Sequence, residues 1–278
     1  MNLPHYLVSF TPGVTPLSTA VEVLPMLAGY LAFIFSAKAF MTDRKPYQLT
    51  SLFRAHNLCL SFASAILLAL MLHEVAPQVW QHGFRHTLCS PKTLTPRLEF
   101  YYILNYYFKF VELFDTVFLV LKKKPLKFLH VYHHAATAWL CYLILYARVP
   151  GAWTAISLNL TVHVVMYYYY YATAGGARFW WKEYLTVTQI GQFIIDLLMI
   201  IYGVYEHYAH NYYQYLPHSG DCSLGRLKHG ELYTFAIFLS YLGLFVNFYM
   251  QTYTRLPSKS KSKNPGASCN GKDIITVR

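Results

Sequence analysis

The sequence contains few charged residues and few cysteines. Asp, Glu, Lys and Arg make up only 13% of its 278 residues, whereas 55% are hydrophobic and the mean hydropathy is +0.29. This composition excludes a disordered chain and argues against a soluble globular domain. The N-terminus lacks the basic segment of a cleavable signal peptide, and no internal repeat is visible. The composition therefore indicates a polytopic membrane protein.

Seven apolar runs approach the length of roughly 20 residues that a helix needs to cross a bilayer. They lie at 22–41, 57–76, 99–121, 128–147, 152–171, 184–208 and 231–253. The runs predict an all-α polytopic membrane protein with seven transmembrane helices, folded as a single domain over residues 1–253. The Lys- and Ser-rich remainder, residues 254–278, is predicted to be a disordered, basic tail.

Acidic residues are scarce, with 12 Asp and Glu against 23 Lys and Arg, for a net charge of +11. Fifteen of these cations fall in one alternate set of loops together with the C-terminal tail, and six fall in the opposite set. Because Lys and Arg concentrate in cytosolic loops, the N-terminus is predicted to be lumenal and the C-terminus cytosolic. The cations are dispersed among membrane loops, so no nucleic-acid site is expected.

The five cysteines do not form a disulfide framework. Cys59 and Cys141 fall within predicted spans, and Cys269 falls in the tail. Cys89 and Cys222 both fall in loops that the charge distribution makes lumenal, and an oxidising lumen permits a bridge between them. Two free thiols are the alternative.

Four of the predicted helices carry a polar stripe, and ionisable groups at membrane depth are by default functional. His130, His133 and His134 stand at i, i+3 and i+4, so their rings share one helix face. The other stripes are Lys109, Glu112, Asp115 and Thr116; Asn159, His163, Met166, Tyr167 and Tyr170; Gln189, Gln192 and Asp196. Structural ion pairs and polar seams between helices stay open as alternatives for these three stripes.

The stripes lie in the cytosolic halves of their helices, which predicts a polar chamber that opens to the cytosol and continues into an apolar bore. A basic mouth above an apolar bore suits an amphiphile with an anionic head and a long alkyl tail, as in acyl-CoA. Basic loop residues are predicted to attract the CoA phosphates. They are Lys122, Lys123, Lys124, Lys127 and Arg178.

Four ordered motifs resemble those of the ELO-type fatty acid elongases, and the residues around the second resemble fungal members most. The motifs are Lys109-x-x-Glu112-x-x-Asp115-Thr116, His130-x-x-His133-His134, Asn159-x-x-x-His163-x-x-Met166-Tyr167-x-Tyr169-Tyr170 and Thr186-x-x-Gln189-x-x-Gln192-Phe193. The resemblance implies that the last six helices enclose a substrate tunnel in the endoplasmic reticulum membrane. It also implies an acyltransferase that condenses malonyl-CoA with a long-chain acyl-CoA. The products are CO₂, CoA and a 3-oxoacyl-CoA two carbons longer.

The resemblance also implies roles for the polar residues. An imidazole can act as a nucleophile, and His133 matches the position of an acyl-histidine intermediate. His163, with Asn159 beside it, is expected to stabilise or protonate the developing oxyanion. His130 and His134 are expected to orient His133 or to bind the thioester oxygen. Supporting roles are expected for Lys109, Glu112, Asp115, Tyr167, Tyr170, Gln189 and Gln192.

No metal and no cofactor are expected beyond the substrates acyl-CoA and malonyl-CoA. The main alternative is a membrane di-iron desaturase or hydroxylase, which carries similar histidine boxes but needs more histidines than the four at usable depth. His56 is predicted to stand alone in a cytosolic loop. A seven-helix transporter would need broken half-helices, and none is visible.

The resemblance to elongases defines the protein's partners and the acyl chain length of its substrates less closely. The reductase and dehydratase of the elongation cycle and membrane lipid are expected partners, and a homodimer is left open. Tunnel depth should limit acyl chain length. The closed end is predicted to lie on the lumenal side, near Met71, His73, Glu206 and His207.

Overall fold

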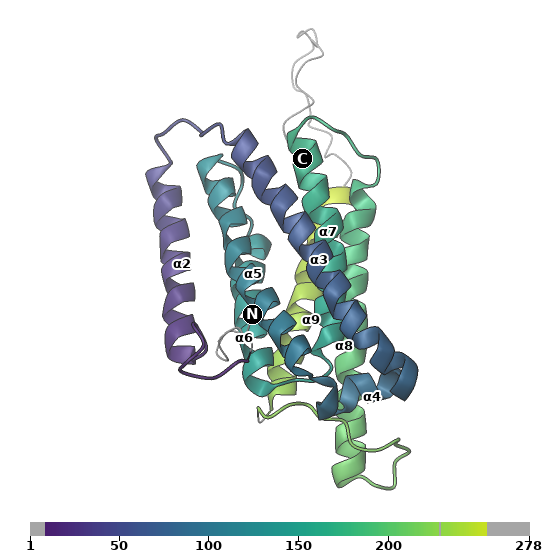
Figure 1. Cartoon of the computed structure of the whole chain (residues 1–278). Helices are drawn as coiled ribbons and strands as arrows, with labels where there is room; N and C mark the ends of the chain where they lie inside the picture. The colour runs from purple at the N-terminus through teal and green to yellow at the C-terminus, as the bar shows by residue number, and fades with distance from the viewer. Residues whose placement is uncertain (1–8, 228, 255–278) are drawn as a thin grey trace.

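The computed structural model describes residues 9–227 and 229–254, and within them the chain is entirely helical apart from its connections. The elements are α2 (Ala20–Phe40), α3 (Thr50–His82), α4 (Phe84–Cys89), η1 (Pro91–Thr93), α5 (Pro96–Leu121), α6 (Phe128–Ala147), α7 (Ala152–Ala174), α8 (Lys182–Tyr212), α9 (Gly230–Tyr249) and the π-helical η2 (Met250–Thr254). Figure 1 shows the long helices side by side in one bundle, with α2 at its edge. The all-α prediction is confirmed for the described residues.

The predicted count of seven helices is exceeded by one. Each predicted span matches a long helix to within a few residues, but the described residues also include α4, which has six residues and carries no apolar run of its own. Within the described residues, four segments are long and apolar enough to cross a membrane: α2, α3, α8 and Gly230–Thr254. The chain is therefore a multi-pass membrane protein. The other three long helices, α5, α6 and α7, carry the Lys109, histidine and Asn159 motifs.

Local sequence signals explain several helix ends near the motifs. α5 begins with Pro96 in its first turn, and the Thr95 hydroxyl accepts a hydrogen bond from the backbone of Leu98 at 3.1 Å. α6 ends at Arg148, which adopts left-handed backbone angles. The following Gly151 is required, because a Cβ there would lie 2.6 Å from the carbonyl oxygen of Leu88. These signals set the tight connection between α6 and α7.

Alternate connections lie at opposite ends of the bundle. Figure 1 shows the connections 41–49, 122–127 and 175–181 at one end, and 148–151, 213–227 and the segment 83–95 with α4 at the other. Helix α3 packs against α7, α5 against α6, and α8 against α9. This alternation separates the loops into the same two sets as the charge count. The assignment of one set to the cytosol stays a prediction, and the tail at 255–278 lies outside the described residues.

A disulfide closes the end of the bundle that holds α4. The structure joins Cys89 to Cys222 across a sequence separation of 133, with an S–S distance of 2.03 Å, and both residues are buried. The backbone N–H of Ser223 donates to the carbonyl of Cys89 at 3.0 Å. The pair that the sequence predicts is therefore linked here, and it ties the segment after α3 to the loop after α8.

Candidate functional site

The three histidines of α6 cluster in its first two turns. The ring centroids of His130 and His134 lie 4.4 Å apart, and those of His133 and His134 lie 5.7 Å apart. His133 also packs against two aromatic rings of α9, at 4.9 Å from Tyr241 and 5.9 Å from Phe245. The imidazoles therefore converge as their spacing predicts, with His133 directed toward α9.

Asp115 of α5 connects the histidine cluster to α3 and α7. Its Oδ1 lies 2.8 Å from Nε2 of His56, and its Oδ2 accepts the hydroxyl of Tyr167 at 2.8 Å. Nε2 of His134 lies 4.0 Å from Oδ2. The prediction that His56 stands alone in a loop is wrong, because α3 begins at Thr50 and carries His56 into the bundle. The sequence did offer one signal for the burial of His56, because this residue stands directly before the apolar run at 57–76.

A second buried network joins α5 to α7. Nζ of Lys109 donates to Oε1 of Glu112 at 2.9 Å and to Oδ1 of Asn159 at 2.7 Å. Nδ2 of Asn159 lies 3.2 Å from Nε2 of His163. Nδ1 of His163 lies 3.2 Å from Oε1 of Glu112 but lacks the alignment of a hydrogen bond, so this contact is electrostatic. The predicted ion pair therefore also orients an amide and an imidazole.

A cavity of about 320 Å³ brings the predicted catalytic residues together. All five line it: His130, His133, His134, Asn159 and His163. Of the predicted supporting residues, Asp115, Tyr170, Gln189 and Gln192 also line it. Lys109, Glu112 and Tyr167 are buried behind its wall, where they contact the lining residues. Residues that the sequence did not single out complete the lining, among them Phe53, Asn57, Lys182, Phe245, Phe248 and Tyr253.

The predicted CoA-binding cations are not all at the cavity. Lys127 lines it, with Nζ 4.4 Å from the ring of Phe248, and Lys182 of α8 lines it too. Lys122 instead lies over the ring of Phe53, and Lys123 donates to backbone carbonyls of the 41–49 loop. Two predicted residues, Lys124 and Arg178, are exposed and do not line it. The electrostatic role of these loop cations stays a prediction.

Two smaller cavities continue from the first toward the disulfide. A middle cavity of about 40 Å³ shares His133, Asn159, Gln192 and Phe193 with the first. It shares Ile144, Ala155 and Phe238 with a distal cavity of about 110 Å³, whose wall includes Cys222. From His133 to Ala147, which lines the distal cavity, α6 rises by about 21 Å at 1.5 Å per residue.

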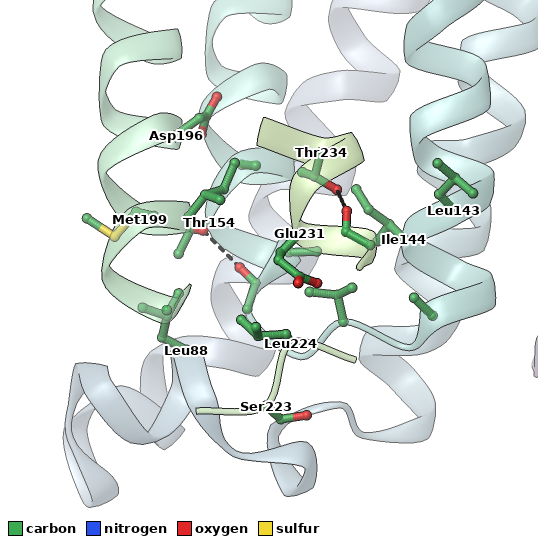
Figure 2. A pocket seen from close by; sticks show the side chains of 18 of the residues that line it. Leu88, Leu143, Ile144, Thr154, Asp196, Met199, Ser223, Leu224, Glu231 and Thr234 are labelled. Carbon is green, nitrogen blue, oxygen red and sulfur yellow. Dashed lines mark hydrogen bonds between the residues drawn. The ribbon is translucent and has the colours of Figure 1, made fainter. Parts of the chain in front are cut away.

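The distal cavity is mainly apolar with a few polar groups. Figure 2 shows Asp196 of α8 and Glu231 of α9 on its walls, with Leu88 and Leu224 toward the disulfide end. Asp196 is buried, and its Oδ1 has no hydrogen-bond partner. The three cavities therefore form a series that begins at the histidines and becomes largely apolar.

The residues predicted to lie near the closed end of the bore do not line the cavities. Met71, His73, Glu206 and His207 line none of these three cavities. Glu206 accepts hydrogen bonds from Arg85 and from the backbone of Ser219, and His207 contacts Asp221. The distal cavity is bounded near Gly203, Cys222 and Leu224, and Glu206 lies three residues after Gly203 on α8. The position of the closed end near these residues therefore stays a prediction.

In the part of the chain that the structure describes, no group of three or more His, Cys, Asp or Glu side chains is placed to hold a metal ion. The imidazoles pair instead with carboxylates, an amide and aromatic rings. The absence of a metal or cofactor from the reaction stays a prediction.

A helical membrane bundle with a histidine-lined cavity that continues into apolar space defines a class of membrane-embedded lipid enzyme. The chain belongs to one family of that class, described as "GNS1/SUR4 family" (ELO). The sequence profile of this family matches residues 15–262. The family membership predicted from the four motifs is therefore confirmed.

Named relatives agree with this family. The chain is 42% identical over 268 residues to a Schizosaccharomyces pombe protein named "Putative fatty acid elongase 1", covering 96% of this chain and 80% of the relative. It is 42% identical over 260 residues to "Putative fatty acid elongase 2" of the same organism, covering 93% and 71%. The human "Very long chain fatty acid elongase 4" is 32% identical over 256 residues, covering 87% and 75%. The predicted likeness to fungal members is confirmed, and the protein is an enzyme of fatty acid elongation.

Proposed function

We propose that the protein condenses malonyl-CoA with a long-chain acyl-CoA, giving CO₂, CoA and a 3-oxoacyl-CoA two carbons longer. One observation carries this proposal: His130, His133, His134, Asn159 and His163 line a single cavity that continues into apolar space. The proposed chemistry needs no metal and no cofactor. The polar cavity would hold the reacting thioesters, and the apolar cavities would hold the alkyl chain.

The first half-reaction acylates His133. A ring nitrogen of His133 attacks the thioester carbonyl, the carbon–sulfur bond breaks, and the proton of the imidazole leaves with the CoA thiol. His133 is suited to this role because it lines both the first and the middle cavity, where the two meet. The acyl chain can then extend toward the distal cavity while CoA departs through the opposite end.

The second half-reaction forms the carbon–carbon bond. Malonyl-CoA loses CO₂, its enolate carbon attacks the acyl carbonyl, and the bond to His133 breaks as the ring takes up one proton from water, the proton that the overall condensation consumes. Negative charge develops on oxygen in both half-reactions, and fixed donors stabilise such charge. Nδ2 of Asn159 supplies such a donor, since Lys109 holds Oδ1 of the same amide from behind at 2.7 Å. The ring of His163 lies beside it, with Nε2 3.2 Å from that Nδ2, and is the proposed proton carrier. Asp115 orients the neighbouring histidine cluster.

The proposed orientation of the substrates also predicts how the protein is placed in the membrane and which enzymes take up its product. The CoA groups would enter at the end of the bundle where Lys127 and Lys182 line the cavity, and we assign this end to the cytosol. The distal cavity and the disulfide would then face the lumen of the endoplasmic reticulum. A reductase and a dehydratase of the elongation cycle would take up the 3-oxoacyl-CoA.

A product assay tests the proposed function. Purified protein in lipid nanodiscs should convert labelled malonyl-CoA and a panel of acyl-CoAs to labelled 3-oxoacyl-CoAs, each two carbons longer than its acceptor. Mass spectrometry of the products measures this conversion directly. Label recovered only in unchanged malonyl-CoA, across the whole panel, would show that the protein does not catalyse condensation.

A leucine at position 155 should shorten the products. Ala155 lines both the middle and the distal cavity, so three extra side-chain carbons would obstruct the passage between them. In the product assay, Ala155→Leu is expected to elongate short acyl-CoAs normally and to lose activity toward long ones by about tenfold.

Ala172→Leu is the matched control for this length prediction. Ala172 is a half-buried residue of the same helix that lines none of the three cavities, so its variant should keep the wild-type product lengths. An unchanged ladder of product lengths for Ala155→Leu would mean that the acyl chain does not follow this path.

A further inference from the structure

Among the described residues that line the 320 Å³ cavity, three have a buried polar atom without a hydrogen-bond partner: Oδ1 of Asn57, Nε2 of His130 and Nδ1 of His163. Nδ1 of His163 faces Oε1 of Glu112 at 3.2 Å, so the atoms left to a bound molecule are those of Asn57 and His130. A buried polar atom left without a partner costs on the order of 1–3 kcal/mol. Unsatisfied groups in a cavity wall therefore indicate what a bound molecule has to supply.

Asn57 presents an acceptor. Its side chain is only 1% exposed, and its Nδ2 donates to the backbone carbonyl of Phe53 at 2.7 Å. This bond fixes the amide so that Oδ1 keeps its full capacity to accept. The neighbouring His56 is fixed too, because it contacts Asp115 at 2.8 Å. The missing partner of Asn57 is therefore a donor, an N–H or an O–H, placed inside the cavity.

His130 presents the complementary atom. It lies one helical turn before His133 and packs against His134, with ring centroids 4.4 Å apart. His134 in turn lies 4.0 Å from Asp115, the carboxylate that also holds His56 beside Asn57. His130 and Asn57 are thus connected along the cavity wall through His134, Asp115 and His56. A neutral imidazole with its proton on Nε2 donates from that atom.

We propose that Asn57 and His130 bind the secondary amide of the pantetheine arm that lies next to the thioester sulfur. An amide has one donor and one acceptor, so its N–H would donate to Oδ1 of Asn57 and its carbonyl would accept from Nε2 of His130. Only two carbons separate this amide from the sulfur, so binding it here holds the thioester beside His133. The inference rests on the proposed function and adds the group by which both CoA substrates are positioned.

Truncated thioesters test the inference. The acyl thioester of N-acetylcysteamine keeps this amide, whereas that of 2-mercaptoethyl acetate replaces its N–H with an ester oxygen. We expect kcat/KM of the wild-type enzyme to be about tenfold higher for the thioester that keeps the amide. A tenfold ratio corresponds to about 1.4 kcal/mol, which is the size of one hydrogen bond. Asn57→Ala should lower the amide value about tenfold and leave the ester value unchanged. Asn57→Asp, which keeps an acceptor at this position, should retain part of the preference.

Ser61→Ala is the matched control, because Ser61 is a buried polar residue of α3 that bonds the carbonyl of Val164 and does not line the cavity. Its variant should leave the amide-to-ester ratio unchanged. Equal loss for both thioesters in Asn57→Ala would assign Asn57 a structural role and overturn the inference. Equal kcat/KM of the wild-type enzyme for the amide and the ester thioester would also overturn the inference. This second measurement does not depend on whether any variant folds. Failure to elongate any acyl-CoA would instead overturn the proposed function.

Discussion

Replacing His133 with alanine is expected to abolish condensation and also the release of CoA from acyl-CoA alone. If His133 carries the acyl group, the reaction is ping-pong, and CoA leaves before malonyl-CoA is needed. Wild-type protein mixed with acyl-CoA should then release a stoichiometric burst of CoA and gain one acyl group on His133. Loss of a nucleophile costs on the order of a thousandfold or more in turnover. A thiol assay measures the burst, and peptide mass spectrometry locates the adduct.

His163→Ala distinguishes the two half-reactions. Its proposed work is in the carbon–carbon bond-forming step, so this variant should keep part of the burst while condensation stops. His130→Ala and His134→Ala should slow both halves. A burst that requires malonyl-CoA, or normal acylation of His133→Ala, would contradict the covalent route. The four imidazoles would then act by acid–base and electrostatic assistance in a ternary complex.

The sequence predicted the site best where one helix supplies neighbouring groups. The spacing of His130, His133 and His134 required only the pitch of an α-helix to place them on one face, and their rings do cluster. The pair of Lys109 and Glu112 is likewise an i, i+3 contact within α5. Such relations are fixed by local geometry, and they survive errors of a few residues in the predicted ends of a helix.

Relations between helices were predicted less well. The start of α3 at Thr50 lies outside the apolar run, because its first turns combine polar and apolar residues, and this error hid His56. Asn57 lay inside the predicted run, but nothing in the sequence showed that it faces the cavity. Lys182 lines the cavity through the packing of α8, and no spacing within one helix reveals that. The contact of Glu206 with Arg85 likewise depends on how α8 is rotated against α4. Rotation and crossing of helices depend on side-chain packing over the whole bundle.

Breaking the buried ion pair of α5 from one side should destabilise the protein strongly. Nζ of Lys109 lies 2.9 Å from Glu112, and its side chain is 2% exposed. Lys109→Met would leave the carboxylate of Glu112 buried without its cation, at a cost of about 3–5 kcal/mol. Arg97→Ala is the matched control on the same helix, because the 78% exposed Arg97 lies 4.0 Å from Glu74 and contributes at most about 1 kcal/mol. Thermal unfolding in detergent measures the free energies of both variants.

The double variant Lys109→Met/Glu112→Leu separates the structural role of this pair from its role in the site. Two apolar side chains of similar volume leave no unpaired charge, so most of the lost stability should return. Activity should not return, because Lys109 also holds Oδ1 of Asn159 at 2.7 Å and Glu112 faces His163 at 3.2 Å. We therefore expect a folded protein whose turnover stays at least a hundredfold below wild type. A double variant that regains both stability and turnover would show that the pair only holds α5 in the bundle, and that Asn159 and His163 act without it.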